Sequence, residues 1–147
     1  MEGEEVELSD VASDRPIPAI THVTKPFWDA AKENRLVVQK CEVCGEVMFL
    51  PRSWCVECGS RALAWEEVDP TGTIYSITVS RVVMMNYPGW KAALPVGLGI
   101  IELDAGPRMY GVVTGGEGGQ GKIGDRVRAV FRDYGDVKVP EFVVVPD

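Results

Sequence analysis

The sequence is poor in histidine and has no long hydrophobic run. His22 is the only histidine among 147 residues, and it stands in a polar lead-in with no second catalytic group near it. No segment approaches the roughly 18 consecutive apolar residues of a membrane-spanning helix. The N-terminus opens with Met-Glu-Gly-Glu-Glu, which lacks the apolar character of a signal segment. We therefore expect a cytoplasmic protein.

Positive charge is also scarce. The net charge is −7, with 15 lysines and arginines against 22 aspartates and glutamates. Most of the excess lies in residues 1–14, which hold six acidic residues and no lysine or arginine. We expect this segment to be a mobile acidic tail. The rest of the chain is nearly neutral, which argues against a nucleic-acid partner, since such binding depends on Lys and Arg neutralising phosphates.

Cysteine is confined to one stretch, and this stretch organises the chain. The four cysteines form two Cys-x-x-Cys-Gly units, Cys41 with Cys44 and Cys55 with Cys58. Two residues between thiols let each unit fold as a tight knuckle, and the glycine after it can take a positive φ. The paired spacing predicts that the four thiolates hold one structural Zn²⁺ in a tetrahedral site with Zn–S distances of about 2.3 Å.

Three other interpretations of the cysteines remain open. Disulfides would suit an exported protein, which the charged N-terminus does not indicate. A rubredoxin-like iron site would use the same four ligands, and ligand softness alone does not separate iron from zinc. A redox dithiol needs one Cys-x-x-Cys at a helix start in a βαβ pattern, whereas here two pairs face each other.

A closed four-thiolate site leaves no coordination position for a substrate. With the cysteines committed to metal, His22 has no partner that could complete a set of nucleophile, base and orienting group. We therefore expect no catalytic residues, and a chain that is not an enzyme by itself.

The first half of the chain predicts a helix and then a ribbon. Residues 15–37 form an expected N-terminal helical segment, with a short helix at 24–33 that has proline in its first turn. Asn34 follows as a candidate left-handed stop. Residues 38–68 are expected to form a rubredoxin-like zinc ribbon.

Within this ribbon, residues 47–51 are the expected return strand, and 63–68 close the sheet. We expect Phe49 and Trp54 to cover the metal and its sulfurs from water. A turn rich in Asp, Pro and Gly at 69–72 marks the end of the ribbon.

The second half, residues 69–147, shows strand patterns without a helical period. The expected strands are 73–83, 96–103, 109–113, 126–131 and 142–145. Five strands in so short a stretch predict a small closed barrel. The fold class is therefore mainly β, with one short helix, a zinc ribbon and a C-terminal five-stranded barrel.

The connection 84–94 between the first two barrel strands concentrates Met, Tyr and Trp, which is unusual for a surface loop. It is either a contact surface for a partner or a plug that folds back over one mouth of the barrel. Both alternatives remain open at the level of the sequence.

The glycine-rich run 116–121 matches two nucleotide-binding patterns by spacing alone. Both motifs need a helix whose N-terminus faces the phosphates, and a strand pattern follows here instead. We therefore expect a flexible hairpin loop without phosphate binding.

Five segments together carry a resemblance to a known family. They are the Phe-Trp helix at 27–30, the leucine strand into the first Cys-x-x-Cys-Gly at 36–45, Phe-Leu-Pro-Arg at 49–52, the barrel entry at 72–79 and the strand at 124–131. In these the chain resembles the zinc-ribbon and OB-fold proteins called domain of unknown function 35. Asn34 stands where the family usually has glycine, a mild departure because asparagine tolerates the left-handed region.

The resemblance implies an OB-fold barrel in a non-catalytic accessory subunit of a thiolase-type complex, which makes or breaks carbon–carbon bonds in acyl-CoA thioesters. The thiolase-like catalytic subunit would be stabilised by this chain, which would also help to shape the acyl-CoA site. The residues predicted to bind this partner are Phe27, Trp28, Met84, Met85, Tyr87 and Trp90, because interfaces are enriched in such anchors.

Two alternative functions stay open. OB barrels with zinc ribbons also bind single-stranded nucleic acid through aromatic platforms in a basic groove, although the acidic balance argues against it. The barrel could instead bind acyl-CoA directly, with Arg126 and Arg128 as candidate contacts for CoA phosphates from one face of a strand. For the same two arginines we favour the other explanation, a solvated strand face whose charges protect a sheet edge.

Overall fold

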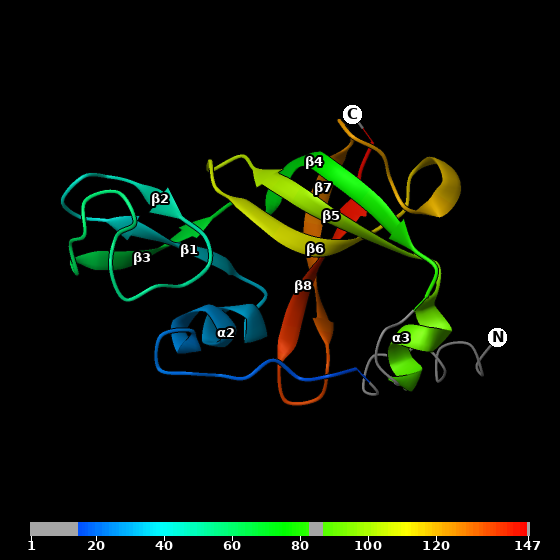
Figure 1. Cartoon of the computed structure of the whole chain (residues 1–147), viewed down its shortest axis with the longest axis horizontal. Helices are drawn as coiled ribbons and strands as arrows, with labels where there is room; N and C mark the ends of the chain where they lie inside the picture. Colours follow the sequence, from blue (N-terminus) through cyan, green and yellow to red (C-terminus); the bar gives the residue numbers. More distant parts are fainter. Residues whose placement is uncertain (1–14, 83–86, 147) are drawn as a thin grey trace.

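The computed structural model describes residues 15–82 and 87–146. A three-stranded sheet carries the cysteines, and a closed five-stranded barrel follows it in the chain (Figure 1). The expected acidic tail lies outside the described residues, as do Met84 and Met85 of the predicted partner-binding set. Among the helices that are described, none combines the length and apolar character needed to cross a membrane.

Helix α2, Lys25–Lys32, forms where the sequence predicts a helix. Pro26 stands in its first turn, where a missing N–H leaves no intrahelical hydrogen bond unmade. Asn34 follows the helix with a φ of 60°, which confirms the expected left-handed stop. The residues that α2 buries are Phe27, Ala30 and Ala31.

Three antiparallel strands form the cysteine ribbon, residues 36–68. They are β1, Leu36–Cys41, β2, Val47–Met48, and β3, Leu63–Val68. The central strand β1 pairs with β2 over two residues and with β3 along its whole length. The return strand β2 is shorter than expected, because Leu50 takes a left-handed φ of 71° that no strand can continue through.

Five longer strands close into the barrel in the order β4-β5-β6-β8-β7. They are β4, Thr71–Ser80, β5, Val96–Leu103, β6, Arg108–Thr114, β7, Arg126–Asp133, and β8, Lys138–Val144. Closure comes from parallel pairing of β6 with β8, at Val113 with Phe142 and Thr114 with Val143. The expected closed five-stranded barrel is confirmed.

One hydrophobic core runs through the ribbon, the helix and the barrel. Helix α2 packs against both β1 and β8, so it joins the two sheets. The largest fully buried side chains are Phe142, Leu36, Ile74, Ile101, Leu103 and Val38. Burial of an aliphatic or aromatic side chain contributes about 1.5–3 kcal/mol, so this shared core holds the two β modules together.

The sequence pattern predicts no helix in the connection 84–94, yet α3, Pro88–Ala93, forms there. Its six residues are too few to display a helical period. Proline at its first position favours helical φ, and the Leu94-Pro95 peptide that follows ends it.

The glycine-rich run is not a hairpin loop, and that prediction is wrong. It connects β6 with β7, which are not neighbours in the barrel, and it holds a 3-10 turn at Glu117–Gly119. Gly121 has a φ of +77°, and a Cβ there would lie 2.8 Å from Ile74 Cδ1 and 3.0 Å from Val113 Cγ1. The glycines therefore let backbone pack tightly onto one end of the barrel, which a hydrophobic pattern does not reveal.

Candidate metal centre and apolar groove

The four cysteine thiols converge in the cysteine ribbon. Their Sγ atoms all lie within 4.8 Å of one another, with 3.6 Å between Cys41 and Cys58 and 3.5 Å between Cys44 and Cys55. Four sulfurs around one zinc ion with Zn–S bonds of about 2.3 Å would stand about 3.8 Å apart. A disulfide would need about 2.05 Å. The four thiols are free and fit one tetrahedral ion.

Each knuckle folds by a backbone turn that ends in glycine. The Gly45 N–H donates to Cys41 O at 2.9 Å, and the Gly59 N–H donates to Cys55 O at 3.0 Å. Both glycines have positive φ, at 80° and 76°. The Cys44 N–H points at the Cys41 Sγ, 3.5 Å away. This hydrogen bond is the main cause that lowers the pKa of Cys41 to about 6, which favours the thiolate that binds metal.

Apolar cover over the sulfurs comes from Met48 and Leu63, which pack on the two buried cysteines. The expectation that Phe49 and Trp54 cover the metal is wrong. Trp54 is 55% exposed, and the Phe49 ring packs edge-on against an aromatic ring of α2. Successive strand residues point to opposite faces, so once Met48 faces the sulfurs its neighbour Phe49 faces the helix.

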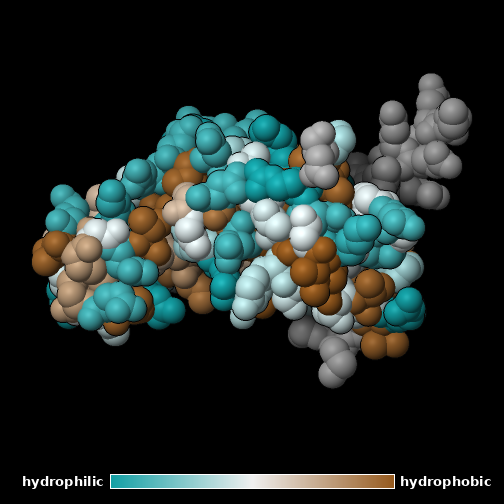
Figure 2. All heavy atoms as spheres, turned by 90° about the horizontal axis from the view of Figure 1, so that it is seen from above, coloured by the Kyte–Doolittle hydropathy of each residue, from teal (hydrophilic) through white to brown (hydrophobic). Residues whose placement is uncertain are grey.

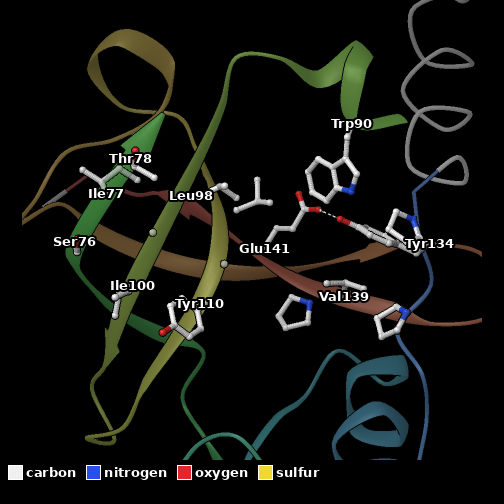
Figure 3. Close-up of a pocket in the computed structure, with 16 residues that line it drawn as sticks. Ser76, Ile77, Thr78, Trp90, Leu98, Ile100, Tyr110, Tyr134, Val139 and Glu141 are labelled. Atoms are coloured by element: carbon white, nitrogen blue, oxygen red, sulfur yellow. Dashed lines mark hydrogen bonds between the residues drawn. The ribbon is translucent and has the colours of Figure 1, made fainter. Parts of the chain in front are cut away.

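A groove of about 590 Å³ crosses the outer face of the barrel (Figure 3). Strands β5 and β6 form its floor, and their neighbours in the barrel, β4 and β8, form its two sides. Its main lining residues are Pro16, Trp90, Leu98, Ile100, Tyr110, Val112, Tyr134, Val139, Pro140 and Glu141. The second and third strands of an OB barrel, with the connections that carry Trp90 and Tyr134 here, are the face at which this fold binds ligands.

Glu141 is the one charged residue among those that line the groove in the described part of the chain. It is buried, and its carboxylate accepts three hydrogen bonds: from Arg15 Nη1 at 3.0 Å, Tyr134 Oη at 2.6 Å and Arg132 Nε at 2.8 Å. Burial, followed by the bond to Glu141, raises the pKa of Tyr134 to about 12, so its hydroxyl stays a neutral donor. These bonds offset the cost of burying a carboxylate.

The predicted partner-binding residues lie in two separate places. Phe27 is only 4% exposed and belongs to the core, and Trp28 is half-buried beside it, with 4.9 Å between the ring centroids. Tyr87 and Trp90 are half-buried at α3, and Trp90 lines the groove. Helices α2 and α3 lie on either side of the β7–β8 hairpin (Figure 1). Among the predicted partner-binding residues that the structure describes, Trp90 is the one that lines the groove.

Exposed apolar side chains also gather at the cysteine ribbon, at the left of Figure 2. They are Val43, Leu50, Trp54 and Val56, which are between 50% and 69% exposed. In the described part of the chain, exposed apolar side chains therefore gather both at the knuckles and along the groove.

The two arginines predicted to contact CoA phosphates do not line the groove. Arg126 makes a two-pronged ion pair with Asp104, at 2.7 Å for each bond, and also donates to Thr73 Oγ1 at 3.1 Å. Arg126, with help from the Thr71 hydroxyl, lowers the pKa of Asp104 to about 2. Arg128 is exposed on the same strand. Arg126 is thus committed to a structural pair.

Sequence reasoning missed the groove and the buried charges beside it. One signal was available: β5 is apolar on both faces, since Leu98 and Ile100 point outward while Ile101 points into the core. A strand with one face in the core and an apolar outer face needs a second covering surface. Arg15 and Glu141 gave no signal, because 126 positions separate them.

Comparison with known proteins places these features in a family. Residues 28–64 match the rubredoxin-like zinc ribbon domain of ChsH2, and residues 65–132 match the C-terminal OB-fold domain of ChsH2. A DUF35 domain-containing scaffold protein of Methanocaldococcus jannaschii is 32% identical over 108 residues, which cover 71% of this chain and 74% of that protein.

A probable enoyl-CoA hydratase alpha subunit of Thermomonospora curvata is 33% identical over 103 residues, which are 69% of this chain but only 30% of that subunit. The chain therefore spans about a third of that relative's length. Among solved structures, the Ltp2-ChsH2(DUF35) aldolase superposes with a TM-score of 0.74 at 27% identity, covering 87% of this chain and 98% of that chain.

Proposed function

The chain belongs to the DUF35 family of zinc-ribbon and OB-fold proteins, and from that membership we propose that it is a non-catalytic accessory subunit of an acyl-CoA enzyme. The cysteine ribbon holds one structural zinc ion on its four thiolates. The barrel docks a catalytic subunit of thiolase type, which carries the nucleophilic cysteine and forms or cleaves a carbon–carbon bond in a CoA thioester.

The observation that carries this proposal is the apolar groove on the ligand-binding face of the barrel. Tyr110 is 71% exposed and Leu98 is 41% exposed on its floor. Apolar surface of this kind is a liability in water unless a partner covers it, and stable interfaces concentrate Tyr and Trp at their centres. The groove therefore supports a docking role.

The described residues support binding more than chemistry. His22 is exposed in the N-terminal lead-in, the four thiols are gathered at one point, and Glu141 is saturated by three donors. Within the described part of the chain, no nucleophile stands beside a free base in the groove. A docked subunit would have to supply the reacting groups.

The name of one relative, a probable enoyl-CoA hydratase alpha subunit, supports an acyl-CoA partner, and the names of a scaffold protein and of an aldolase complex support a role beside a catalytic subunit. A thiolase-type partner is our own more specific proposal. We also propose that the acyl part of the substrate lies at the shared surface, since 590 Å³ falls within the usual range of ligand sites. Arg128, which is exposed, remains available to a CoA phosphate.

A single-stranded nucleic-acid partner is the weaker candidate. The groove offers aromatic rings, but the charged residue in its described lining is Glu141, and the net charge of the chain is −7. Affinity for nucleic acid depends on cations that track the phosphate backbone. The described lining of the groove contains no lysine or arginine that could serve as such a cation.

Copurification from the native host tests the proposal. A tagged wild-type chain is compared with Leu98→Asp, which places a charge in the groove, and with Val43→Asp, which places one on the exposed knuckle. Mass spectrometry should find a thiolase-fold catalytic subunit with the wild type and Val43→Asp, and lose it with Leu98→Asp. Recovery of nucleic acid, or equal recovery of the catalytic subunit with all three chains, would overturn the proposal.

A further inference from the structure

The groove has an end wall that the barrel itself does not supply. The strap, residues 15–18, crosses this end and contributes Pro16 and Pro18 to the lining, while α3 contributes Trp90 (Figure 3). In Figure 1 the chain crosses the β7–β8 hairpin close to its turn as it runs from the strap to α2. Three segments from distant parts of the sequence therefore meet at this end of the groove.

One side chain of the strap contacts both of the other segments. Arg15, 8% exposed, donates from Nη1 to Glu141 Oε2 and to Tyr134 Oη, each at 3.0 Å. Its guanidinium carbon lies 4.1 Å from the centre of the Trp90 ring and 5.5 Å from that of Tyr134. A guanidinium on an indole face combines cation–π attraction with stacking. Arg15 thus joins the strap and α3 to the β7–β8 hairpin.

Few other interactions hold the strap and α3 in place. Within the described residues, strap residues 15–18 make no backbone hydrogen bond, and the backbone bonds of Trp90 and Lys91 run to Tyr87 at the start of the same helix. In the same part of the chain, α3 packs extensively against no other helix or strand. Segments held by few contacts open at low free-energy cost.

The Arg15 guanidinium does not satisfy all of its hydrogen-bond donors. Its Nε is buried and has no hydrogen-bond partner among the described residues. A buried donor without a partner raises the free energy of the closed arrangement relative to one in which water or a bound group can reach it. Glu141, by contrast, keeps Tyr134 and Arg132 as donors if Arg15 leaves.

We propose that Arg15 is a latch, by which we mean a side chain whose contacts hold the strap and α3 closed over one end of the groove. In the closed state it pins the strap and α3 onto the β7–β8 hairpin and completes the end wall of the groove. In the open state the strap leaves, Trp90 loses its cation, and Glu141 remains paired in an intact barrel. An occupant that needs the space covered by Pro16 and Pro18 favours the open state, because a ligand shifts an equilibrium only through its different affinity for the two states.

The latch gives the proposed docking groove a regulatory element, and in that sense it rests on the proposed function. The latch itself is a property of the free chain, so it can be tested without any partner. Failure to find a catalytic subunit would leave this test unaffected, and failure of this test would leave the docking proposal standing.

Hydrogen exchange of the isolated full chain tests the latch, using Arg15→Met and the matched control Arg132→Gln. Both variants remove one donor from Glu141, but Arg132 touches neither the strap nor α3 in the described contacts. We expect the amides of residues 89–93 to exchange at least about tenfold faster in Arg15→Met, since α3 then opens independently. The same amides should keep wild-type rates in Arg132→Gln.

A second readout is acrylamide quenching of Trp90, obtained by subtracting the signal of a Trp90→Phe chain in each background. Quenching should increase in Arg15→Met and not in Arg132→Gln, while the amides of β5 and β7 stay protected in both. If Arg15→Met does not fold, Arg15→Lys is used, because lysine keeps the charge but lacks the planar group that stacks on indole. Unchanged exchange and quenching in the folded Arg15 variant, or equal changes in the Arg132 control, would overturn the latch.

Discussion

Gly111 and Phe142 fit against each other inside the barrel, on the side where β6 and β8 close it. A Cβ at Gly111 would lie 2.6 Å from Cδ2 and 2.7 Å from Cε2 of Phe142. Phe142 is fully buried, so its ring has no free space into which it can move. The absence of a side chain at Gly111 therefore sets how closely β6 approaches β8.

The first prediction follows from this contact. Gly111→Ala should lower the free energy of unfolding by about 1–3 kcal/mol, because an added methyl group overpacks a filled core. Urea unfolding measures the loss. Tyr110→Ala is the matched control, since Tyr110 is the adjacent residue and points outward with 71% exposure, and it should change stability by no more than about 0.5 kcal/mol. Equal stability of the Gly111 variant and wild type would contradict the packing account.

The second prediction concerns the metal centre. Cys44→Ser should remove the ion and unfold the cysteine ribbon, because structural zinc contributes on the order of 10 kcal/mol to small sites. Elemental analysis and proteolysis of residues 36–68 measure both effects, with Ser53→Ala, at an exposed position nearby, as the control. A purified wild-type chain without metal, or a Cys44 variant with unchanged resistance to proteolysis, would be incompatible with a structural zinc site.

The third prediction is a pH dependence from the pair of Asp104 with Arg126. The pKa of Asp104 is lowered to about 2 in the folded chain, so its ionised form stabilises the fold above the ordinary value of 3.8, and this contribution disappears as pH falls toward 2. Both side chains are more than a third exposed, so the contribution is at most about 1 kcal/mol.

The difference in unfolding free energy between wild type and Asp104→Asn should therefore be present at pH 7, shrink below about pH 4 and vanish near pH 2. The comparison between the two chains removes the effect of acid on the cysteine site, which both share. A difference that stays constant from pH 7 to pH 3 would assign the pair no role in the acid dependence.

The sequence predicted those features of the structure that are determined by a few neighbouring residues. Cysteine spacing, the left-handed stop at Asn34 and the strand alternation each depend on a few neighbouring residues, so the ribbon and the barrel were predicted. The pair of Arg15 with Glu141 joins distant positions, and the contact of Gly111 with Phe142 follows from the closure of the barrel. No pattern among neighbouring residues predicts either contact. The same reason explains why Phe27, an aromatic residue suited to an interface, proves to be core.

The fourth prediction separates the two roles that Trp90 can have. Trp90 lines the groove and also stacks on Arg15, so Trp90→Ala should weaken partner binding by roughly one to three decades and also loosen α3 and the strap. Titration calorimetry with the catalytic subunit measures affinity, and thermal unfolding and hydrogen exchange of the free chain measure stability. A variant that opens at α3 but binds the partner normally would assign Trp90 to the latch alone.

Tyr110→Ala gives the most direct test of the claim that the groove docks the catalytic subunit, because this side chain is exposed on the groove floor. The dissociation constant of the complex and the melting temperature of the free chain are measured for wild type and variant. The account predicts a dissociation constant raised by about tenfold or more, at an unchanged melting temperature. An unchanged dissociation constant in a fully folded Tyr110→Ala chain would contradict it.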